Sequence, residues 1–563
     1  MPDATVDGYR AAGVRRPPGQ GRTMNTHADG ARTRVQDTPS GRLAGRRAGG
    51  VDRFLNIPYA EPPIGAGRFR SPRPERPWAG VREAELAGAA PPQTVAGIVN
   101  WIYPAPERTD EDCLGINVWT PEGAGANGGG RRRPVLLWLY GGAFVTGSNG
   151  LPLADGARLA AEGDIVVVAP NYRLGMLGFA AHPALRDPLT GAQANWGLQD
   201  QARALEWVHA NIEAFGGDPD RITVMGQSAG AVSACLLAQH PDTAPRFARL
   251  VLASVPHIAP PDVATAEDLA VYVEDLAAHF GTTVPGLRHL SARDLTQGEA
   301  AFFAGYEVRT RTGHGRRWPA LDGSVVAAWP GARALADKPM LIGNTRTESS
   351  FTLDLYDPLQ DGQLTPPLPD GKAALHAAVN RLLRQRFAGG APRIDAAQLL
   401  AAFDPQGRAA RSPGEVLIAL QSDAAYRYPT WRIAQAAAAA GNGSVYYYEF
   451  AQPLAAPARG TPHNADVPFW FGTHGHPFYR PKLGAGAQVE RLSLAMRTML
   501  INFVRAGEPS GAGLPAWPAL PPAPGLAAPR IMRFGANADG ECASVGEMPD
   551  VERFEALAPL QTF

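Results

Sequence analysis

The sequence has 563 residues, and its 53 basic and 53 acidic side chains give a formal net charge of zero. Without a basic excess to attract phosphate groups, nucleic acid is not an expected partner. No apolar run reaches the roughly 18 residues of a membrane-spanning helix, so no membrane partner is expected either. The expected partner is a small molecule, bound by a monomer or a homodimer.

The first forty residues are rich in Gly, Arg and Pro and contain no apolar core. Residues 1–40 are therefore predicted to be a disordered extension, with Met24 as an alternative start. Arg15-Arg16 precedes prolines rather than an apolar segment, so no export leader is expected. Three cysteines are too few for a disulfide framework. We expect a reduced, cytoplasmic protein in which residues 41–563 form a single domain.

Beyond residue 41, strand-like apolar runs alternate with helical patterns, which predicts an α/β fold around a mostly parallel sheet. The runs 135–140, 165–169 and 222–225 each end at a loop. Ligands of open α/β sheets bind outside the carboxyl ends of the strands, so these loops are expected to carry the function. An apolar stripe at helical spacing over 198–215 predicts a helix packed on the sheet.

Two later segments, 263–314 and 370–440, are rich in Ala and Leu and are predicted to be helical. They are expected either to flank the sheet or to form helical insertions that cover the site. Their pattern does not distinguish these two arrangements.

The motif Gly-Gln-Ser-Ala-Gly at 226–230 follows the third apolar run and precedes a helical stretch. It predicts a nucleophile elbow, a sharp strand-to-helix turn that projects Ser228 clear of the backbone. Gly226 and Gly230 are expected where a side chain would collide with the neighbouring strand or helix. The motif alone recurs by chance in Gly-rich chains, so its interpretation depends on the rest of the sequence.

From about residue 41 to 518, a series of ordered motifs resembles the type-B carboxylesterase and cholinesterase-like family of α/β-hydrolases. The motifs precede the elbow and lie at 54–63 (Phe-Leu-Asn-Ile-Pro-Tyr-Ala-Glu-Pro-Pro), 111–114 (Glu-Asp-Cys-Leu), 171–175 (Asn-Tyr-Arg-Leu-Gly), 195–201 (Asn-Trp-Gly-Leu-Gln-Asp-Gln) and 215–219 (Phe-Gly-Gly-Asp-Pro). The resemblance implies an α/β-hydrolase fold that requires no cofactor and no metal.

The resemblance also implies a triad in the chain order Ser, acid, His. Ser228 matches the nucleophile, Glu348 matches the acid after a strand-like run, and His463 matches the base. The implied activity is hydrolysis of carboxylic esters through an acyl-enzyme. An amidase, a carbamate hydrolase or an acyltransferase with the same triad remains an alternative. A non-catalytic binding protein of the same fold is a further alternative.

The segment Tyr-Gly-Gly-Ala-Phe at 140–144 resembles the family's oxyanion loop. By this likeness, the oxyanion hole consists of backbone N–H groups at Gly142, Ala143 and Ala229. The candidate substrate-pocket residues are the aromatic side chains of Trp101, Tyr103 and Phe144.

Several positions depart from the family pattern. Cys113 has no upstream cysteine, so the disulfide common in secreted relatives is not expected. At Ser254-Val255-Pro256, relatives often have a serine that supports the triad, and the altered segment leaves that support open. Asp466 belongs either to a buried polar network or to a solvated cap. His474 and His476 predict a polar loop rather than a metal site.

Overall fold

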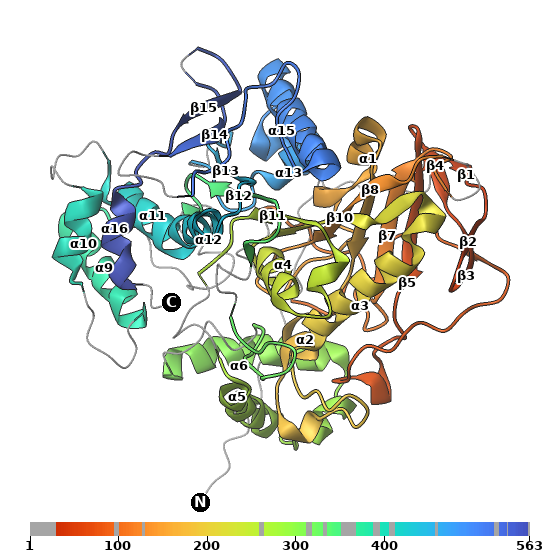
Figure 1. Ribbon diagram of the computed structural model, residues 1–563. Coiled ribbons are helices and arrows are strands. Elements are labelled where there is room, and N and C mark those ends of the chain that lie inside the picture. The colour runs from red at the N-terminus through yellow and green to blue at the C-terminus, as the bar shows by residue number, and fades with distance from the viewer. Residues whose placement is uncertain are drawn as a thin grey trace, which may run out of the picture.

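The protein folds around a large twisted sheet, seen in the computed structural model in Figure 1. The structure describes residues 30–560 except 95–100, 126–129, 258–263, 311–317, 330–334, 351–367, 387–393, 405–410, 456–459, 523–528 and 538. Within these residues the main sheet has twelve strands in the order β1-β4-β5-β7-β9-β8-β10-β11-β12-β13-β14-β15, and a small second sheet has the order β2-β3-β6.

The centre of the main sheet is parallel, from β9 through β8 and β10 to β14. Several of its strands are buried along their whole length, as expected for a sheet covered on both faces. The parallel strands are β8 (Arg133–Leu139), β9 (Val166–Pro170), β10 (Gly217–Gln227), β11 (Arg249–Ala253), β12 (Met340–Thr345), β13 (Val445–Phe450) and β14 (Arg530–Phe534). This arrangement confirms the predicted α/β fold.

Antiparallel strands complete both ends of the main sheet. They are β1 (Ala31–Arg32), β4 (Arg46–Ala48), β5 (Val51–Pro58), β7 (Gly115–Pro121) and, at the other end, β15 (Ala543–Glu547). The second sheet consists of β2 (Gln36–Thr38), β3 (Gly41–Ala44) and β6 (Val81–Glu83).

Helices flank the sheet. The predicted helix over 198–215 is α3 (Trp196–Asn211) followed by a 3₁₀ turn, and it contacts α4 (Ala229–Gln239) and β10. Another pair, α1 (Ala157–Gly163) and α15 (Ala487–Ala506), packs together and contacts strands of the same sheet. No helix in the described residues is long and apolar enough to cross a membrane.

The two Ala- and Leu-rich segments are helical, as predicted. The first contains α5 (Ala266–His279) and α6 (Ala292–Thr310). The second contains α9 (Lys372–Arg386), α10 (Ala396–Phe403), α11 (Pro413–Ser422), the π-helical turn η10 (Asp423–Arg427) and α12 (Tyr428–Ala439). Figure 1 shows α9, α10 and α11 gathered at one side with the C-terminal helix α16 (Arg553–Leu557), which contacts α10.

Folded structure begins before the expected boundary at residue 41. Within the predicted extension, residues 1–29 lie outside the described part of the chain, but β1 pairs with β4 and β2 pairs with β3. The polar composition concealed these strands because both residues of β1 are exposed and Arg32 pairs with Glu83 on the surface.

Candidate active site

Ser228 lies at the turn between β10 and α4, in the strained conformation expected of an elbow. Its backbone has φ 54° and ψ −123°, a region that side chains other than glycine rarely occupy. A Cβ added to Gly226 would lie 2.1 Å from the carbonyl oxygen of Gly230, and one added to Gly230 would lie 2.0 Å from that of Leu139. Both flanking positions therefore require glycine for the steric reason predicted.

Glu348 and His463 come together although they are far apart in the sequence. Glu348 follows the carboxyl end of β12, and His463 lies in the loop after the neighbouring strand β13. The Nδ1 atom of His463 is 2.5 Å from Oε2 of Glu348, and the backbone N–H of His463 donates to the Glu348 carbonyl at 3.0 Å. The glutamate is fully buried and the histidine is 7% exposed. This close pair is shielded from water, which strengthens its electrostatic interaction.

Ser254 provides the support for the acid that the altered segment left open. It follows β11, which lies between β10 and β12, and its hydroxyl donates to Oε1 of Glu348 at 2.6 Å. The backbone N–H of Thr345 donates to the same oxygen at 2.8 Å. The carboxylate thus receives donors on both oxygens, which fixes its orientation toward His463.

The predicted oxyanion loop follows β8 and lies against the elbow. Gly142, Ala143 and Phe144 all have positive φ angles, of 111°, 53° and 60°. A Cβ on Gly141 would lie 3.0 Å from Cβ of Ser228, so the loop approaches the serine closely. The predicted third donor, Ala229, is the first residue of α4, where backbone N–H groups have no partner within the helix.

The three aromatic residues predicted for the substrate pocket have different positions. Phe144 is completely buried, with its ring 4.8 Å from that of Phe179, so it belongs to the core behind the loop. Its assignment to the substrate pocket stays a prediction. Tyr103 is also buried, and its hydroxyl accepts a hydrogen bond from Asn464 at 3.1 Å. Trp101 is half-buried and its carbonyl accepts from Lys482.

Two contacts to His463 were not foreseen. The side chain of Gln227, the residue before the predicted nucleophile, places its Nε2 atom 3.0 Å from Nε2 of His463. The ring of Tyr426, from η10, lies 4.4 Å from the imidazole, measured between ring centres, at an interplanar angle of 37°. For Gln227, its position directly before Ser228 could have indicated that its side chain lies near the site. Nothing in the sequence places Tyr426 near the site.

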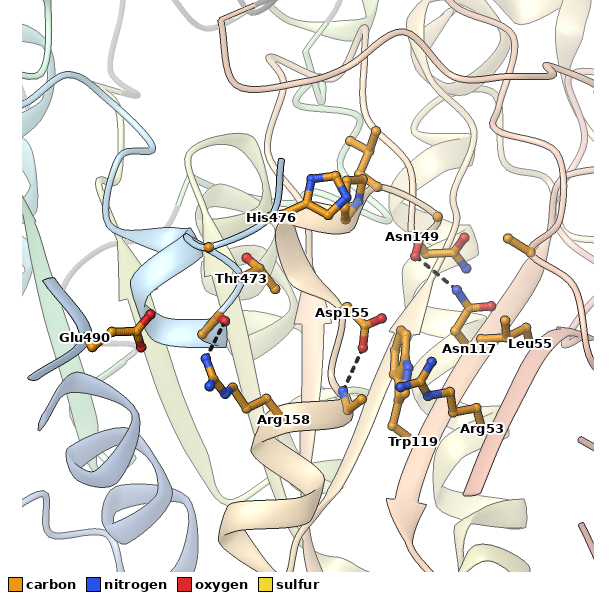
Figure 2. Close-up of a pocket in the computed structure, with 17 residues that line it drawn as sticks. Arg53, Leu55, Asn117, Trp119, Asn149, Asp155, Arg158, Thr473, His476 and Glu490 are labelled. Atoms are coloured by element: carbon orange, nitrogen blue, oxygen red, sulfur yellow. Dashed lines mark hydrogen bonds between the residues drawn. The ribbon is translucent and has the colours of Figure 1, made fainter. Parts of the chain in front are cut away.

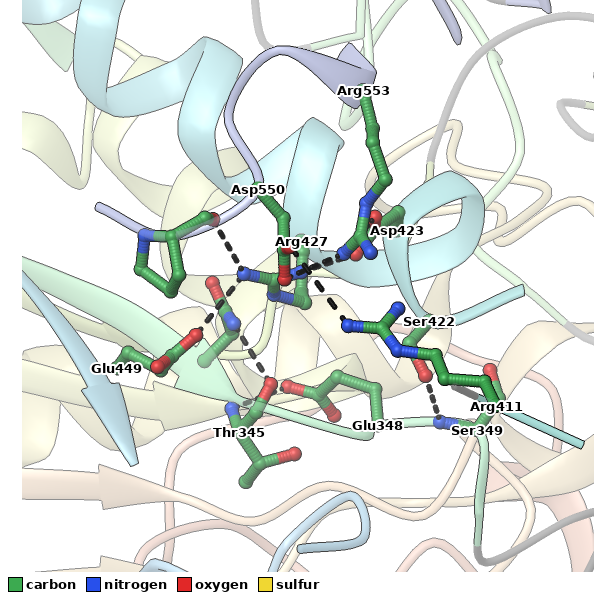
Figure 3. A network of polar contacts seen from close by, with 12 residues as sticks. Thr345, Glu348, Ser349, Arg411, Ser422, Asp423, Arg427, Glu449, Asp550 and Arg553 are labelled. Carbon is green, nitrogen blue, oxygen red and sulfur yellow. Dashed lines mark hydrogen bonds and ion pairs between the residues drawn. The ribbon is translucent and has the colours of Figure 1, made fainter. Parts of the chain in front are cut away.

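A buried ionic network lies beside the acid loop (Figure 3). Arg427 pairs with Asp423 at 2.5 Å and with Glu449 at 3.0 Å, and Arg553 of the C-terminal helix also pairs with Asp423 at 3.0 Å. At the end of α11, the Ser422 hydroxyl accepts from the backbone N–H next to Glu348 at 2.9 Å. The network therefore connects the C-terminal helix α16, the helix α11 and the turn η10 to the loop after β12 that carries Glu348.

Asp466 belongs to a buried polar cluster rather than to a solvated cap. It is fully buried and accepts hydrogen bonds from the Tyr448 hydroxyl at 2.7 Å and from Trp470 Nε1 at 3.3 Å. Burial, together with the nearby Glu348 charge, raises the pKa of this carboxyl to about 6.

A cavity of about 430 Å³ opens elsewhere, shown in Figure 2. Its wall includes Arg53 and Trp119 from paired strands, together with Asp155, Arg158 and His476. None of the predicted triad, oxyanion or aromatic pocket residues lines it. The cavity is therefore not the site predicted from the sequence.

The remaining candidate groups have ordinary structural surroundings. All three cysteines are free, and Cys235 is buried in α4, where burial raises the pKa of its thiol to about 12. His474 pairs with Glu490 at 3.1 Å. Within the described ranges, no group of three or more His, Cys, Asp or Glu side chains is arranged to hold a metal ion.

Comparisons with known proteins agree with this geometry. A model of the carboxylesterase family matches residues 32–539. Phenmedipham hydrolase of Pseudarthrobacter oxydans is 33% identical over 497 residues, 86% of this chain and 92% of that protein. Para-nitrobenzyl esterase of Bacillus subtilis is 31% identical over 491 residues, with the same coverage of each chain.

Similarity extends to solved structures. The crystal structure of a carboxylesterase from Geobacillus stearothermophilus superposes with a TM-score of 0.75 and 30% identity, covering 93% of this chain and 99% of that one. The family match, the relatives and the shared architecture span most of the sequence. The chain therefore belongs to the type-B carboxylesterase family of α/β-hydrolases and is a serine hydrolase of the carboxylesterase class.

Proposed function

We propose that this enzyme hydrolyses small or medium-sized apolar carboxylic esters through an acyl-enzyme on Ser228, with His463 as the base and Glu348 as the acid. The observation that carries the proposal is the buried 2.5 Å contact between Glu348 and His463. It lies at the same sheet edge as the elbow, since β10, β11, β12 and β13 are parallel neighbours.

The Glu348–His463 contact determines which nitrogen is basic. An ionised carboxylate only accepts hydrogen bonds, so Nδ1 of His463 carries the proton that faces Glu348. The neutral imidazole then has its lone pair on Nε2. In the first step Ser228 Oγ attacks the ester carbonyl while Nε2 takes the hydroxyl proton. Nε2 then gives this proton to the departing alkoxide, and the alcohol leaves.

The attack places negative charge on the carbonyl oxygen of the ester. The backbone N–H groups of Gly142, Ala143 and Ala229 are the proposed donors to it, each worth about 3 kcal/mol of transition-state stabilisation. Their suitability follows from the close approach of the loop to Ser228 and from the position of Ala229 at the start of α4. Backbone donors are fixed before the reaction begins, so their orientation costs no reorganisation.

In the second step, water replaces the alcohol at the acyl carbon. His463 Nε2 takes a proton from the water, the oxygen adds to the acyl group, and the carboxylic acid leaves as Ser228 regains its proton. An amine or an alcohol that reaches the acyl-enzyme would give an amide or a new ester instead. The same residues can also open an amide or a carbamate, so these reactions remain the alternative activity.

The test is hydrolysis of p-nitrophenyl esters of increasing acyl length by the wild type and by Ser228→Ala. A matched control is Ser233→Ala, because this serine is buried in the same helix. We expect activity in the wild type and the control and none in Ser228→Ala. The chain-length optimum measures the acyl pocket, and para-nitrobenzyl esters and phenmedipham test the substrates named in its relatives.

Each other outcome has a distinct meaning. Ester turnover that survives in Ser228→Ala refutes the proposed nucleophile. Faster release from anilides or carbamates than from matched esters favours the alternative activity. A folded wild type that neither turns over any substrate nor reacts with a fluorophosphonate supports the alternative of a non-catalytic binding protein.

A further inference from the structure

Gln227 lies between the proposed base and the oxyanion loop. It is the last residue of β10 and is fully buried. Its Nε2 atom is 3.0 Å from Nε2 of His463, the nitrogen on which the proposed mechanism depends. On the other side of the amide, Oε1 is so close to Gly141 that a Cβ there would lie 2.3 Å away. The amide thus fills the space between the two parts of the site.

Protonation at the other ring nitrogen fixes the direction of this contact. Since Nδ1 donates to Glu348, the neutral imidazole has only a lone pair at Nε2. A neighbour at hydrogen-bond distance must then donate, and the NH₂ group of Gln227 is the donor. The oxygen and nitrogen ends of a glutamine amide have similar shapes, so shape alone does not determine its orientation. Here the lone pair on Nε2 of His463 determines it, because only the NH₂ end can donate.

The contact has different consequences for the two protonation states of His463. An N–H group that donates to Nε2 stabilises the neutral ring. After Nε2 takes a proton, both groups carry hydrogen and the contact becomes unfavourable unless the amide turns to present Oε1. In the described residues Oε1 is buried without a hydrogen-bond partner, so no bond of its own holds it in place.

We infer that Gln227 is a positioning residue: in the free enzyme its NH₂ group donates to the Nε2 lone pair of His463 and orients the neutral ring, and it must release Nε2 before Ser228 can give its proton to that nitrogen. The inference rests on the proposed function, because it assigns a role to Gln227 only if His463 is the base. A residue with this role sets the acid limb of the pH–rate profile, whereas a residue needed only for packing does not.

Two substitutions of similar size separate these roles. Gln227→Glu replaces the donor with a carboxylate, which favours the protonated imidazole and moves the acid limb of kcat/KM upward by about one pH unit or more. Gln227→Met removes the donor without adding charge, so its limb should move upward by less. The pH of the acid limb should therefore be lowest in the wild type, higher in Gln227→Met and highest in Gln227→Glu.

Other ionisable groups near His463 must be held constant in this test. Glu348 contacts Nδ1, Tyr426 packs on the ring, and Asp466 lies in the same segment. Burial raises the pKa of Asp466 to about 6, which falls in the same pH range. The series is therefore measured both in the wild-type background and in Asp466→Asn, and the order should be the same in both.

The assay is p-nitrophenyl ester hydrolysis from pH 4 to 9, with circular dichroism to confirm folding and Ser228→Ala as the inactive reference. If the acid limbs of kcat/KM fall at the same pH in all three proteins, or in the reverse order, the role of Gln227 is overturned. The proposed function still stands in that case, provided that Ser228→Ala is inactive. Retained turnover in Ser228→Ala refutes the proposed function itself. If the methionine variant does not fold, the nearly isosteric glutamate variant decides alone, because an unmoved limb contradicts the inference.

Discussion

Removal of the Ser254 hydroxyl is the sharpest test of how the acid is held. In Ser254→Ala, Oε1 of Glu348 loses its 2.6 Å donor and keeps only the backbone N–H of Thr345. A hydrogen bond to a charged group contributes about 1.5–3 kcal/mol, so the free energy of unfolding should fall by that amount. The carboxylate also loses orientation toward His463, so kcat/KM should fall by roughly tenfold to a hundredfold.

The backbone at this position supplies a matched control. Ser254 has φ 53°, a conformation that glycine adopts without strain and alanine does not. Ser254→Gly and Ser254→Ala therefore lose the same hydroxyl, but the glycine variant should be more stable by about 1 kcal/mol. Urea unfolding measures the stabilities, and ester hydrolysis measures kcat/KM.

The two variants should lose activity equally although their stabilities differ. If the glycine variant regains activity along with stability, backbone strain rather than the hydroxyl accounts for the effect. Wild-type activity in Ser254→Ala would likewise refute the reasoning, since Glu348 would then be oriented without this donor.

Other predictions concern the buried carboxyl, the ionic network and the elbow. The pKa of Asp466 is raised from 3.8 to about 6 in the folded state. The folded protein thus binds the proton more tightly, and stability falls as pH rises through this window. Urea unfolding should show Asp466→Asn gaining about 3 kcal/mol relative to the wild type between pH 3 and 7, and a pH-independent difference would contradict this. Arg427→Met removes one ion pair from each of two buried carboxylates, leaving Asp423 paired with Arg553 and Glu449 with Arg533. It should therefore cost about 3 kcal/mol in the same assay, at the lower end for a broken buried pair, against a surface Arg→Met control with no loss. Gly230→Ala places a Cβ 2.0 Å from the Leu139 carbonyl and should abolish esterase activity, whereas wild-type turnover would refute the steric argument.

The sequence was most informative where local chemistry determines structure. The elbow glycines, the buried parallel strands and the helical stripe after Asn195 follow from spacing and sterics within short segments. Family likeness supplied the pairing of Glu348 with His463, because the two residues lie 115 positions apart and no local pattern spans that distance.

The rest of the site depends on tertiary contacts that one sequence does not encode locally. Tyr426 reaches His463 only because a π-helical turn projects it from a distant segment. Phe144 is an aromatic residue in the predicted oxyanion loop, and its sequence position does not reveal what its ring contacts. In the structure the residue has a positive φ and the ring packs against Phe179 in the core. Short polar strands such as Ala31–Arg32 show no apolar alternation, so composition placed the domain boundary too late.

Peptide mapping of a fluorophosphonate adduct identifies the nucleophile without a choice of substrate. We expect one phosphonylated residue, Ser228, in the wild type, and a labelling rate lower by roughly a thousandfold or more in His463→Ala. An adduct on another residue, or a labelling rate unchanged without His463, would contradict the assignment of this triad.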